Sequence, residues 1–368
     1  MIGRLPVLVL LAIVLQLVRC QTSNKSISNK VASEGQVCQA GDVIGRCVPI
    51  KEYPEYAAIL KKQFRSAQET QYLNDRFCGY TPARKALVCK PVKINEPHCG
   101  RQFTDRIVKG NLTELDEYPW MALFQYKKPK GFGFYCGGAL INTRYVLSAA
   151  HCFVGLRYGW EVIKVRLGEW DVESDEDCTG TDDERNCAPP IQEFDLERII
   201  PHEGFSVKSN NKVHDIALVR MSGDAQYSNF VAPICLPEPG CVANMKRLMD
   251  GVLIASGWGK TENSSASRYK LYTKLHCSNY EDCKANYIAR KAISLTEGQF
   301  CAQGDAGQDT CNGDSGGPLM KQIGEQARYY VTGVVSFGPS KCGEQLPGVY
   351  TKVEHYYKWI VQKIVETS

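Results

Sequence analysis

Residues 309–318 read Asp309-Thr-Cys-Asn-Gly-Asp-Ser-Gly-Gly-Pro318, and this segment is more informative than any other in the chain. Ser315 stands between an acid and two glycines, a composition that favours a tight turn over a helix or strand. Such a turn exposes the serine oxygen and aims backbone N–H groups at one point, as a nucleophile with an oxyanion hole requires. The alternative is an ordinary glycine-rich surface turn, because short motifs also occur by chance.

Two further segments supply the partners that a serine nucleophile needs. Leu147-Ser-Ala-Ala-His-Cys152 places His151 beside a cysteine, and Asn211-Lys-Val-His-Asp-Ile-Ala-Leu218 places Asp215 just before an apolar run. Taken singly, they could be a buried structural histidine and a turn acid. In the order His151, Asp215, Ser315, they resemble the chymotrypsin-like serine proteases.

The resemblance gives each residue a role. A serine hydroxyl is a weak nucleophile and needs a base, which His151 supplies. Asp215 fixes the tautomer of His151 and stabilises its cation, while the N–H groups of Gly313 and Ser315 form the oxyanion hole. Ser336 is expected to donate a hydrogen bond to Asp215 from behind. The chemistry needs no cofactor.

Substrate preference also follows from the resemblance. Asp309 occupies the position at the floor of the primary pocket, where an acid is typical of trypsin, and it would pair with a substrate Arg or Lys. The predicted substrate-binding set is Asp309, Ser336, Gly338 and Gly348, with the glycines as pocket walls. Phe337 replaces the usual Trp. The alternative for Asp309 is a solvated loop acid.

The chain carries the signs of export. Residues 1–20 combine a basic start with a short apolar run, which predicts a signal peptide. No later run is long enough for a membrane helix, so we expect no membrane anchor. A net charge of +4 without a basic tract argues against nucleic-acid binding. Glycosylation sequons begin at Asn24, Asn111 and Asn263.

The 17 cysteines become an even number once Cys20 leaves with the signal, as expected of a disulfide framework. Residues 107–368 show short strands separated by turns and a helical pattern over 355–366. The strands are expected at 121–125, 139–148, 162–167, 216–221, 252–257, 329–336 and 348–353. The resemblance implies an all-β protease domain of two six-stranded antiparallel β-barrels with a C-terminal helix.

Residues 36–90 contain four cysteines, at positions 38, 47, 78 and 89, and a helix is expected over 56–70. The segment resembles an arthropod clip domain, which usually has six cysteines. Tyr53 and Lys90 stand where the other two belong, so one whole disulfide is missing. The alternative is an unrelated disulfide-stapled propeptide.

Residues 91–106 form a linker that ends in an activation site. In Asp105-Arg-Ile-Val-Lys-Gly110, the resemblance implies cleavage between Arg106 and Ile107. The new amino group of Ile107 would insert beside Asp314 and order the oxyanion loop. Because the residue before the cut is basic, the activator is expected to be a trypsin-like protease. The alternative is a chance Arg-Ile pair at a domain start.

The resemblance also implies a set of disulfides. The expected pairs are Cys38–Cys89, Cys47–Cys78, Cys99–Cys235, Cys136–Cys152, Cys178–Cys187, Cys283–Cys301 and Cys311–Cys342, which leaves Cys241 and Cys277 to pair by elimination. Residues 169–177 are densely acidic. By composition alone this is a solvated charged loop, but similar clip proteases imply a structural calcium ion held by Glu169, Asp171, Ser174 and Asp177.

The family resemblance implies a secreted zymogen that cleaves proteins after Arg or Lys in the haemolymph of an arthropod. Its substrate would be a downstream zymogen, as in prophenoloxidase activation and melanisation, or the cytokine precursor of Toll, and a serpin would inhibit it. The alternatives are a non-catalytic clip homologue acting as a binding cofactor, and a developmental or digestive trypsin-like protease.

Overall fold

The structure is a computed structural model that describes residues 31–367, apart from 42, 93, 103–111, 181–183, 239–249, 261–263, 265, 305–313, 325 and 340–345. The chain forms two compact units, and the boundary between them falls at Lys90 and Pro91. The first is called the clip unit below and the second the protease unit. In the described part of the chain, no helix is both long and apolar enough to cross a bilayer.

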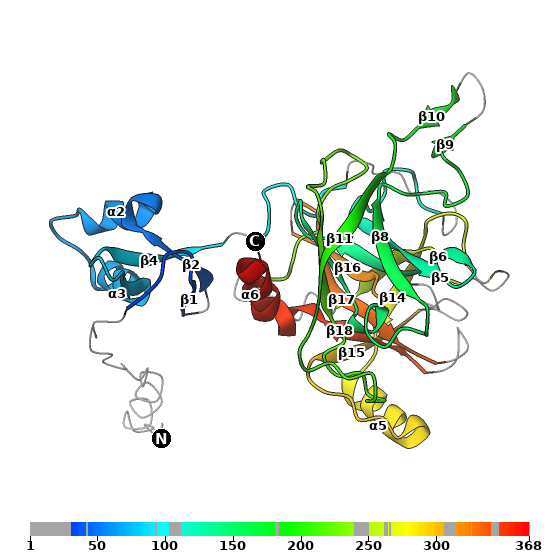
Figure 1. Cartoon of the computed structure of the whole chain (residues 1–368). Helices are drawn as coiled ribbons and strands as arrows, with labels where there is room; N and C mark the ends of the chain where they lie inside the picture. The colour runs from blue at the N-terminus through cyan, green and yellow to red at the C-terminus, as the bar shows by residue number, and fades with distance from the viewer. Residues whose placement is uncertain are drawn as a thin grey trace, which may run out of the picture. The chain divides into compact units, whose positions relative to one another are not determined.

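The clip unit is a four-stranded sheet with two short helices (Figure 1). The strands lie in the order β1-β2-β4-β3, and the elements are β1 (Val37–Ala40), β2 (Val43–Pro49), α2 (Pro54–Leu60), α3 (Ala67–Asp75), β3 (Phe77–Tyr80) and β4 (Ala86–Pro91).

The prediction of a single helix over residues 56–70 is wrong. Ser66 caps α3 by accepting from the Glu69 N–H (3.1 Å), and the Glu69 carboxylate accepts from the Ser66 N–H (2.9 Å), so the helices are separate.

The protease unit contains two closed six-stranded barrels, which confirms the predicted fold. Barrel 1 has the order β11-β12-β7-β6-β5-β8 and barrel 2 the order β13-β14-β15-β18-β17-β16, with antiparallel neighbours. Barrel 1 comprises β5 (Met121–Lys128), β6 (Gly131–Leu140), β7 (Tyr145–Ser148), β8 (Glu161–Leu167), β11 (Gln192–Pro201) and β12 (Ala217–Met221). Barrel 2 comprises β13 (Val252–Gly257), β14 (Leu271–Cys277), β15 (Gln299–Gly304), β16 (Pro318–Ile323), β17 (Arg328–Phe337) and β18 (Gly348–Lys352).

Strands β11, β14, β15 and β16 were not expected from the sequence, and the strand expected over 139–148 and the C-terminal helix have other bounds. The strand expected over 139–148 is in fact the end of β6, a turn and β7. Asn142 makes that turn, because its side-chain oxygen accepts from the N–H groups of Arg144 and Tyr145, both at 2.9 Å. The C-terminal helix α6 spans Tyr357–Thr367, slightly later than expected, and its apolar face is buried.

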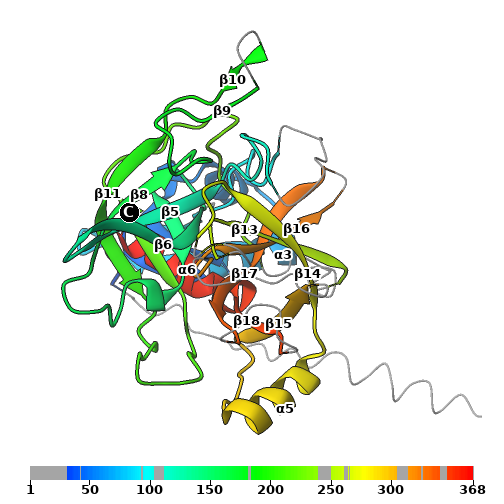
Figure 2. The same cartoon turned by 90° about the vertical axis from the view of Figure 1, so that its right-hand side faces the viewer.

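Two elements project from opposite ends of the barrels in both views (Figure 1, Figure 2). One is the hairpin of β9 (Cys178–Thr179) and β10 (Asn186–Cys187), and the other is helix α5 (Tyr280–Lys291). Asn279 caps α5 by accepting from two N–H groups of its first turn.

Six predicted disulfides are confirmed. They are Cys38–Cys89, Cys47–Cys78, Cys99–Cys235, Cys136–Cys152, Cys178–Cys187 and Cys283–Cys301. Cys277 has no disulfide partner among the described cysteines, while Cys241, Cys311 and Cys342 lie outside the described residues.

Candidate active site

His151 lies in a short 3-10 turn, Ala150–Cys152, that follows strand β7. The disulfide Cys136–Cys152 ties this turn to β6, and the Tyr126 hydroxyl donates to the carbonyl of Cys152 at 2.8 Å. Burial raises the pKa of Tyr126, so the hydroxyl stays a donor. The turn that presents the imidazole is therefore fixed from two sides.

Asp215 precedes strand β12 and is completely buried. Its Oδ2 lies 2.8 Å from His151 Nδ1, and its Oδ1 accepts from the His151 backbone N–H at 2.9 Å. Burial alone would raise the pKa of Asp215, but the charge and hydrogen bonds of His151 and the hydroxyl of Ser336 outweigh it, so the pKa is lowered. Asp215 is therefore ionised at neutral pH and faces the imidazole edge that holds its proton.

Barrel 2 supplies the other partners of Asp215. Ser336, near the end of β17, donates its hydroxyl to Oδ2 at 2.5 Å, and Thr351 of β18 donates to the Asp215 carbonyl at 2.8 Å. Thus an acid that enters from barrel 1 is held by two hydroxyls from barrel 2. The orientation of the imidazole depends on both barrels.

Ser315 lies in a turn between the barrels. Its carbonyl accepts from the Gly137 N–H of β6 at 2.8 Å, while the Gly316 N–H donates to Val335 of β17 at 2.9 Å. Gly316 has a φ of 77°, and a side chain there would overlap the Ser148 hydroxyl, so the turn requires glycine.

The disulfide Cys136–Cys152 lies between the imidazole of His151 and the turn that contains Ser315. The sulfur of Cys152 lies 3.9 Å from His151 Nε2 and 3.7 Å from the Ser315 carbonyl oxygen. The structure therefore brings His151, Asp215 and Ser315 into one site. Gly313, the other predicted oxyanion donor, lies outside the described residues.

The described part of the predicted substrate pocket contains Gly338 and Gly348. A Cβ built on Gly338 would lie 3.6 Å from the Gly348 Cα. The two glycines therefore face each other closely, and neither places a side chain between them. Phe337 stacks edge-on against Tyr287 at 5.8 Å between ring centroids, which fixes an aromatic wall beside them. Asp309 lies outside the described residues.

Asp314 is next to the nucleophile and accepts a hydrogen bond from the Gly259 N–H at 3.0 Å. A side chain on Gly257 or Gly259 would overlap the Asp314 carboxylate, so this carboxylate fits only against bare backbone. Arg106 and Ile107, the predicted activation site, lie outside the described residues.

The acidic loop is where a calcium ion was expected, and its four residues divide into two pairs. Glu169 and Asp177 are both buried and both accept from the Trp170 N–H, at 3.1 and 2.7 Å. The Asp171 carboxylate instead pairs with Arg268 through two bonds of 2.7 Å. The Ser174 hydroxyl donates to the carbonyl of Glu176 at 2.7 Å.

The ionisable groups around Glu169 and Asp177 bear on whether this pair could hold a cation. Burial raises the pKa of both Glu169 and Asp177, and each lies close to another acid. Arg166 bonds Glu169 at 2.7 Å. Burial also lowers the pKa of Lys270, which is near both acids, to about 8. Two converging, desolvated carboxylates are a hard-cation donor set. Glu169 and Asp177 are therefore the two carboxylates of the loop that turn inward, with Glu169 also paired to Arg166, whereas Asp171 and Ser174 bond to Arg268 and Glu176.

Several residues that build the site were not found from the sequence. Thr351, Gly137 and Gly259 each act through one long-range hydrogen bond, and nothing in their local sequence marks them. His214 adopts a φ of 62° beside Asp215, and its Nδ1 lies 3.0 Å from the Tyr356 hydroxyl. The only sequence feature that could have pointed to His214 is its position directly before Asp215.

Comparisons with known proteins agree with this geometry. Residues 107–360 match the family model for trypsin, and residues 38–89 match the model for the regulatory CLIP domain of proteinases. CLIP domain-containing serine protease B4 of Anopheles gambiae is 44% identical over 331 residues, which cover 87% of this chain and 89% of that protein. Melanization protease 1 of Drosophila melanogaster is 43% identical over 273 residues, covering 73% and 68%.

A solved structure shares the fold. The crystal structure of the Drosophila Grass clip serine protease of the Toll pathway superposes with a TM-score of 0.66 at 30% sequence identity. The superposition covers 91% of this chain and 99% of that chain. The similarity therefore extends over both units rather than over the barrels alone.

Proposed function

Because this chain belongs to the trypsin family of serine endopeptidases and carries a clip domain, we propose that it is a secreted zymogen that cleaves proteins after Arg or Lys in an immune cascade. The observation that carries the catalytic part is the buried Asp215 carboxylate, held by Ser336 and bonded to His151 beside the Ser315 turn. The names of the relatives, a melanization protease and a protease of the Toll pathway, support the cascade.

The catalytic steps follow from these contacts. His151 Nδ1 donates to Asp215, which leaves Nε2 to accept the proton of the Ser315 hydroxyl as the oxygen attacks the substrate carbonyl. The ionised Asp215 stabilises the imidazolium that forms. His151 then gives its proton to the leaving amine, the peptide bond breaks, and water repeats the sequence on the acyl-enzyme. The oxyanion is proposed to bind at the N–H groups of Gly313 and Ser315.

Activation would require cleavage after Arg106, and the contacts of Asp314 support this. Its carboxylate lies against bare backbone at Gly257 and Gly259, beside the nucleophile. A new amino group at Ile107 would compete for this carboxylate and reorganise the adjoining turn. An upstream trypsin-like protease is the proposed activator, and a serpin the proposed inhibitor.

The test is activation of the purified full-length protein. After cleavage by a trypsin-like protease, it should hydrolyse Arg and Lys amide substrates and leave matched Phe and Leu substrates uncut. The Arg106→Gln variant should remain inactive after the same treatment. Purified prophenoloxidase-activating zymogens and the Toll cytokine precursor then identify the substrate. Equal cleavage after Arg and Leu would contradict the trypsin-like preference.

The clip unit is proposed to be a four-cysteine form of the domain. Tyr53 takes one position of the absent disulfide and is buried, with its hydroxyl 2.6 Å from that of Tyr72. Tyr53 is thus held in the core by a hydrogen bond to Tyr72, whereas Lys90, the other substituted position, is exposed. The two disulfides Cys38–Cys89 and Cys47–Cys78 remain to close the domain.

Calcium is proposed to stabilise the acidic loop through Glu169 and Asp177. At a calcium concentration about ten times Kd, the folded state should gain about 1.4 kcal/mol. A melting curve in ~1 mM calcium against one in chelator measures this. Asp177→Asn should abolish the shift, whereas Glu173→Gln, an exposed acid of the same loop, should keep it. An unchanged melting temperature in the parent protein would contradict the site.

A further inference from the structure

An exposed surface of cations and aromatic rings lies at one end of barrel 1. It is formed by the turn between β5 and β6 and by the neighbouring loop 155–160. We call it the basic-aromatic surface, and it comprises Lys128, Lys130, Phe132, Tyr135, Arg157 and Tyr158. The side chain of Tyr158 is fully exposed and that of Phe132 is 60% exposed. Large apolar rings in water mark an interaction site more often than a structural one when they gather together.

The two segments are packed against each other. A Cβ on Gly159 would lie 2.9 Å from the ring of Pro129, so the loop rests directly on the turn. The rings of Tyr135 and Trp160 are 4.7 Å apart between centroids. The Lys128 ammonium donates to the Tyr135 hydroxyl at 2.6 Å. These contacts fix Lys128, Tyr135 and the loop backbone, while the rings of Phe132 and Tyr158 extend into solvent, where a partner can reach them.

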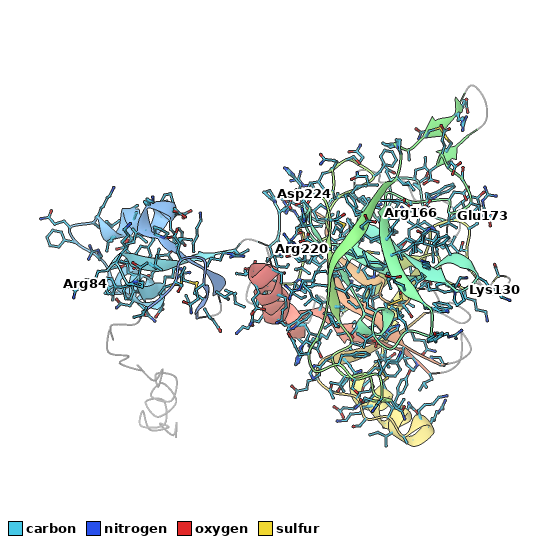
Figure 3. All side chains as sticks on the ribbon, viewed as in Figure 1. Arg84, Lys130, Arg166, Glu173, Arg220 and Asp224 are labelled. Atoms are coloured by element: carbon cyan, nitrogen blue, oxygen red, sulfur yellow. A yellow bond between two sulfur atoms is a disulfide. The ribbon has the colours of Figure 1, made fainter. Side chains whose placement is uncertain are left out.

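Cations outnumber acids on the surface, and the nearest acid in sequence is Glu161, which lies opposite Lys127 where β5 pairs with β8. Residues 126–135 and 155–160 contain three lysines and one arginine and no acidic residue. Arg157 instead lies over the ring of Trp160, 5.5 Å from its centroid. Within the described part of the chain, neither Lys130 nor Arg157 forms an ion pair. Figure 3 shows Lys130 at the outer edge of the protease unit, beyond β5 and β6.

The position of the basic-aromatic surface relative to Ser315 determines which part of a bound substrate can reach that surface. The pocket glycines, Gly338 and Gly348, belong to barrel 2, so the residue before the cut bond sits there. His151 belongs to barrel 1 and protonates the leaving amine, so the chain after the cut bond leaves across barrel 1. Strand β6 runs from Gly137, bonded to Ser315, to Gly131 at the turn, which is about 20 Å in extended chain.

We infer that the basic-aromatic surface binds an acidic segment of the protein substrate, about four to eight residues after the cleaved bond. The lysines and Arg157 attract the carboxylates, while Phe132 and Tyr158 pack against apolar side chains between them. The inference rests on the proposed cleavage of proteins by this site. It adds a second determinant of specificity, which would separate one Arg-containing substrate from another.

The experiment compares three substrates of the activated full-length enzyme. Two are quenched-fluorescence peptides that are identical up to the cleaved Arg and extend beyond it with Asp and Glu or with Asn and Gln at the sixth to eighth positions. The third is a short Arg amide with only a dye after the cut. For each enzyme variant, kcat/KM on a long peptide is divided by its kcat/KM on the short amide.

The parent enzyme should prefer the acidic peptide by about tenfold at low salt, and the preference should shrink in high salt because exposed charges are screened. Lys130→Glu combined with Arg157→Glu should abolish or reverse it, and Tyr158→Ala should weaken it. Lys291→Glu, on helix α5, is the matched control and should preserve it. Equal cleavage of both peptides by the parent, or a preference that survives the double variant, would overturn the inference. Failure to cleave even the short amide would instead refute the proposed function.

Discussion

In the clip unit, the core consists largely of cystines and tyrosines, whereas each barrel of the protease unit encloses mainly aliphatic side chains. One clip cluster contains Tyr53, Tyr56, Leu73 and Val88, and another contains Leu87 among four cysteines. The cluster in barrel 2 includes Leu253, Leu275, Leu319, Val335 and Tyr350. A small domain buries too little apolar surface to fold by packing alone, so covalent links replace part of the core.

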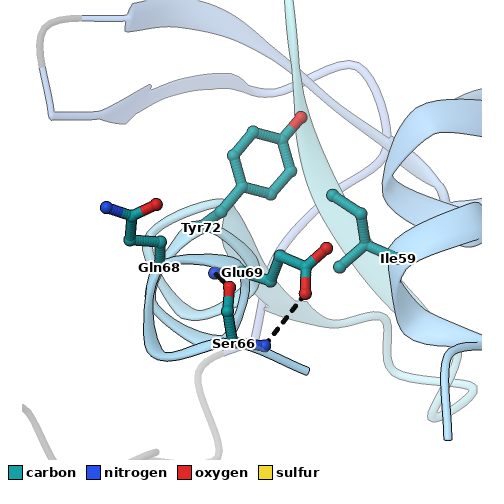
Figure 4. Close-up of a pocket in the computed structure, with 5 residues that line it drawn as sticks. All are labelled: Ile59, Ser66, Gln68, Glu69 and Tyr72. Atoms are coloured by element: carbon teal, nitrogen blue, oxygen red, sulfur yellow. Dashed lines mark hydrogen bonds between the residues drawn. The ribbon is translucent and has the colours of Figure 1, made fainter. Parts of the chain in front are cut away.

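The two units also differ in which contacts shape their surfaces. In the protease unit, the site lies between the barrels, and its acid from barrel 1 depends on Ser336 and Thr351 of barrel 2. In the clip unit, an open, shallow pocket of about 450 Å³ lies beside α3, lined by Ile59, Ser66, Gln68, Glu69 and Tyr72 (Figure 4). Two of its lining residues, Ser66 and Glu69, form the cap of α3. Damage to one unit should therefore spare the other.

The largest expected effect comes from Asp215→Asn, which should leave both units folded and reduce kcat by about 10⁴. The amide cannot stabilise the imidazolium, and it favours the wrong tautomer of His151. The measurement is kcat on an Arg amide after activation, with a melting curve to show that the barrels persist.

Asp224→Asn is the matched control for this change. Asp224 is an exposed acid of the same unit, 59% exposed and 3.8 Å from Arg144, and it is labelled in Figure 3. Its loss should leave kcat unchanged. An Asp215→Asn enzyme within tenfold of the parent would show that the buried carboxylate is structural.

The next effect should appear in the clip unit alone. Replacing both Cys47 and Cys78 with Ala removes a link across 31 residues, which should cost the clip unit roughly 3–4 kcal/mol. Hydrogen exchange should show residues of the clip unit losing protection while the barrels keep theirs. Hydrolysis of a short Arg amide should remain unchanged after activation. A comparable loss of protection in the barrels would mean that the units are energetically coupled.

Much of this fold and site could be predicted because the informative residues act locally. The Ser315 turn needs glycines beside it, and the buried Asp215 must precede an apolar strand, so both leave patterns in the sequence. Strand β11 is harder to find, because half of its residues are exposed and only one is buried. Thr351 and Gly137 could not be found for a different reason: each meets its partner only after the barrels assemble.

The acidic loop shows the same limit. Its composition indicates a cation site, but composition does not say which carboxylates turn inward. Asp171 is engaged by Arg268, a residue distant in sequence, and only the structure shows that Glu169 and Asp177 form the converging pair. The break between the two helices of the clip unit, in contrast, follows from one local motif, the cap at Ser66.

The smallest effect should come from that motif. Ser66 accepts from the Glu69 N–H, and the Glu69 carboxylate accepts from the Ser66 N–H, as Figure 4 shows. Ser66→Ala leaves an N–H at the start of α3 without its partner and should cost the clip unit about 1 kcal/mol. Ser66→Gly should cost only a few tenths of this amount, because water can reach the N–H groups past glycine.

Denaturant unfolding of the clip unit, followed by hydrogen exchange in the full-length protein, measures both variants. Both substitutions remove the capping oxygen, so their difference measures how far water can replace it at the exposed N–H groups. Lys62 provides a second check, since it pairs with Glu69 at 2.5 Å on an exposed face. Lys62→Ala should cost less than the cap, because an exposed ion pair contributes about 0–1 kcal/mol. If Ser66→Ala destabilised the unit no more than Lys62→Ala, the capping hydrogen bond would not be what separates α2 from α3.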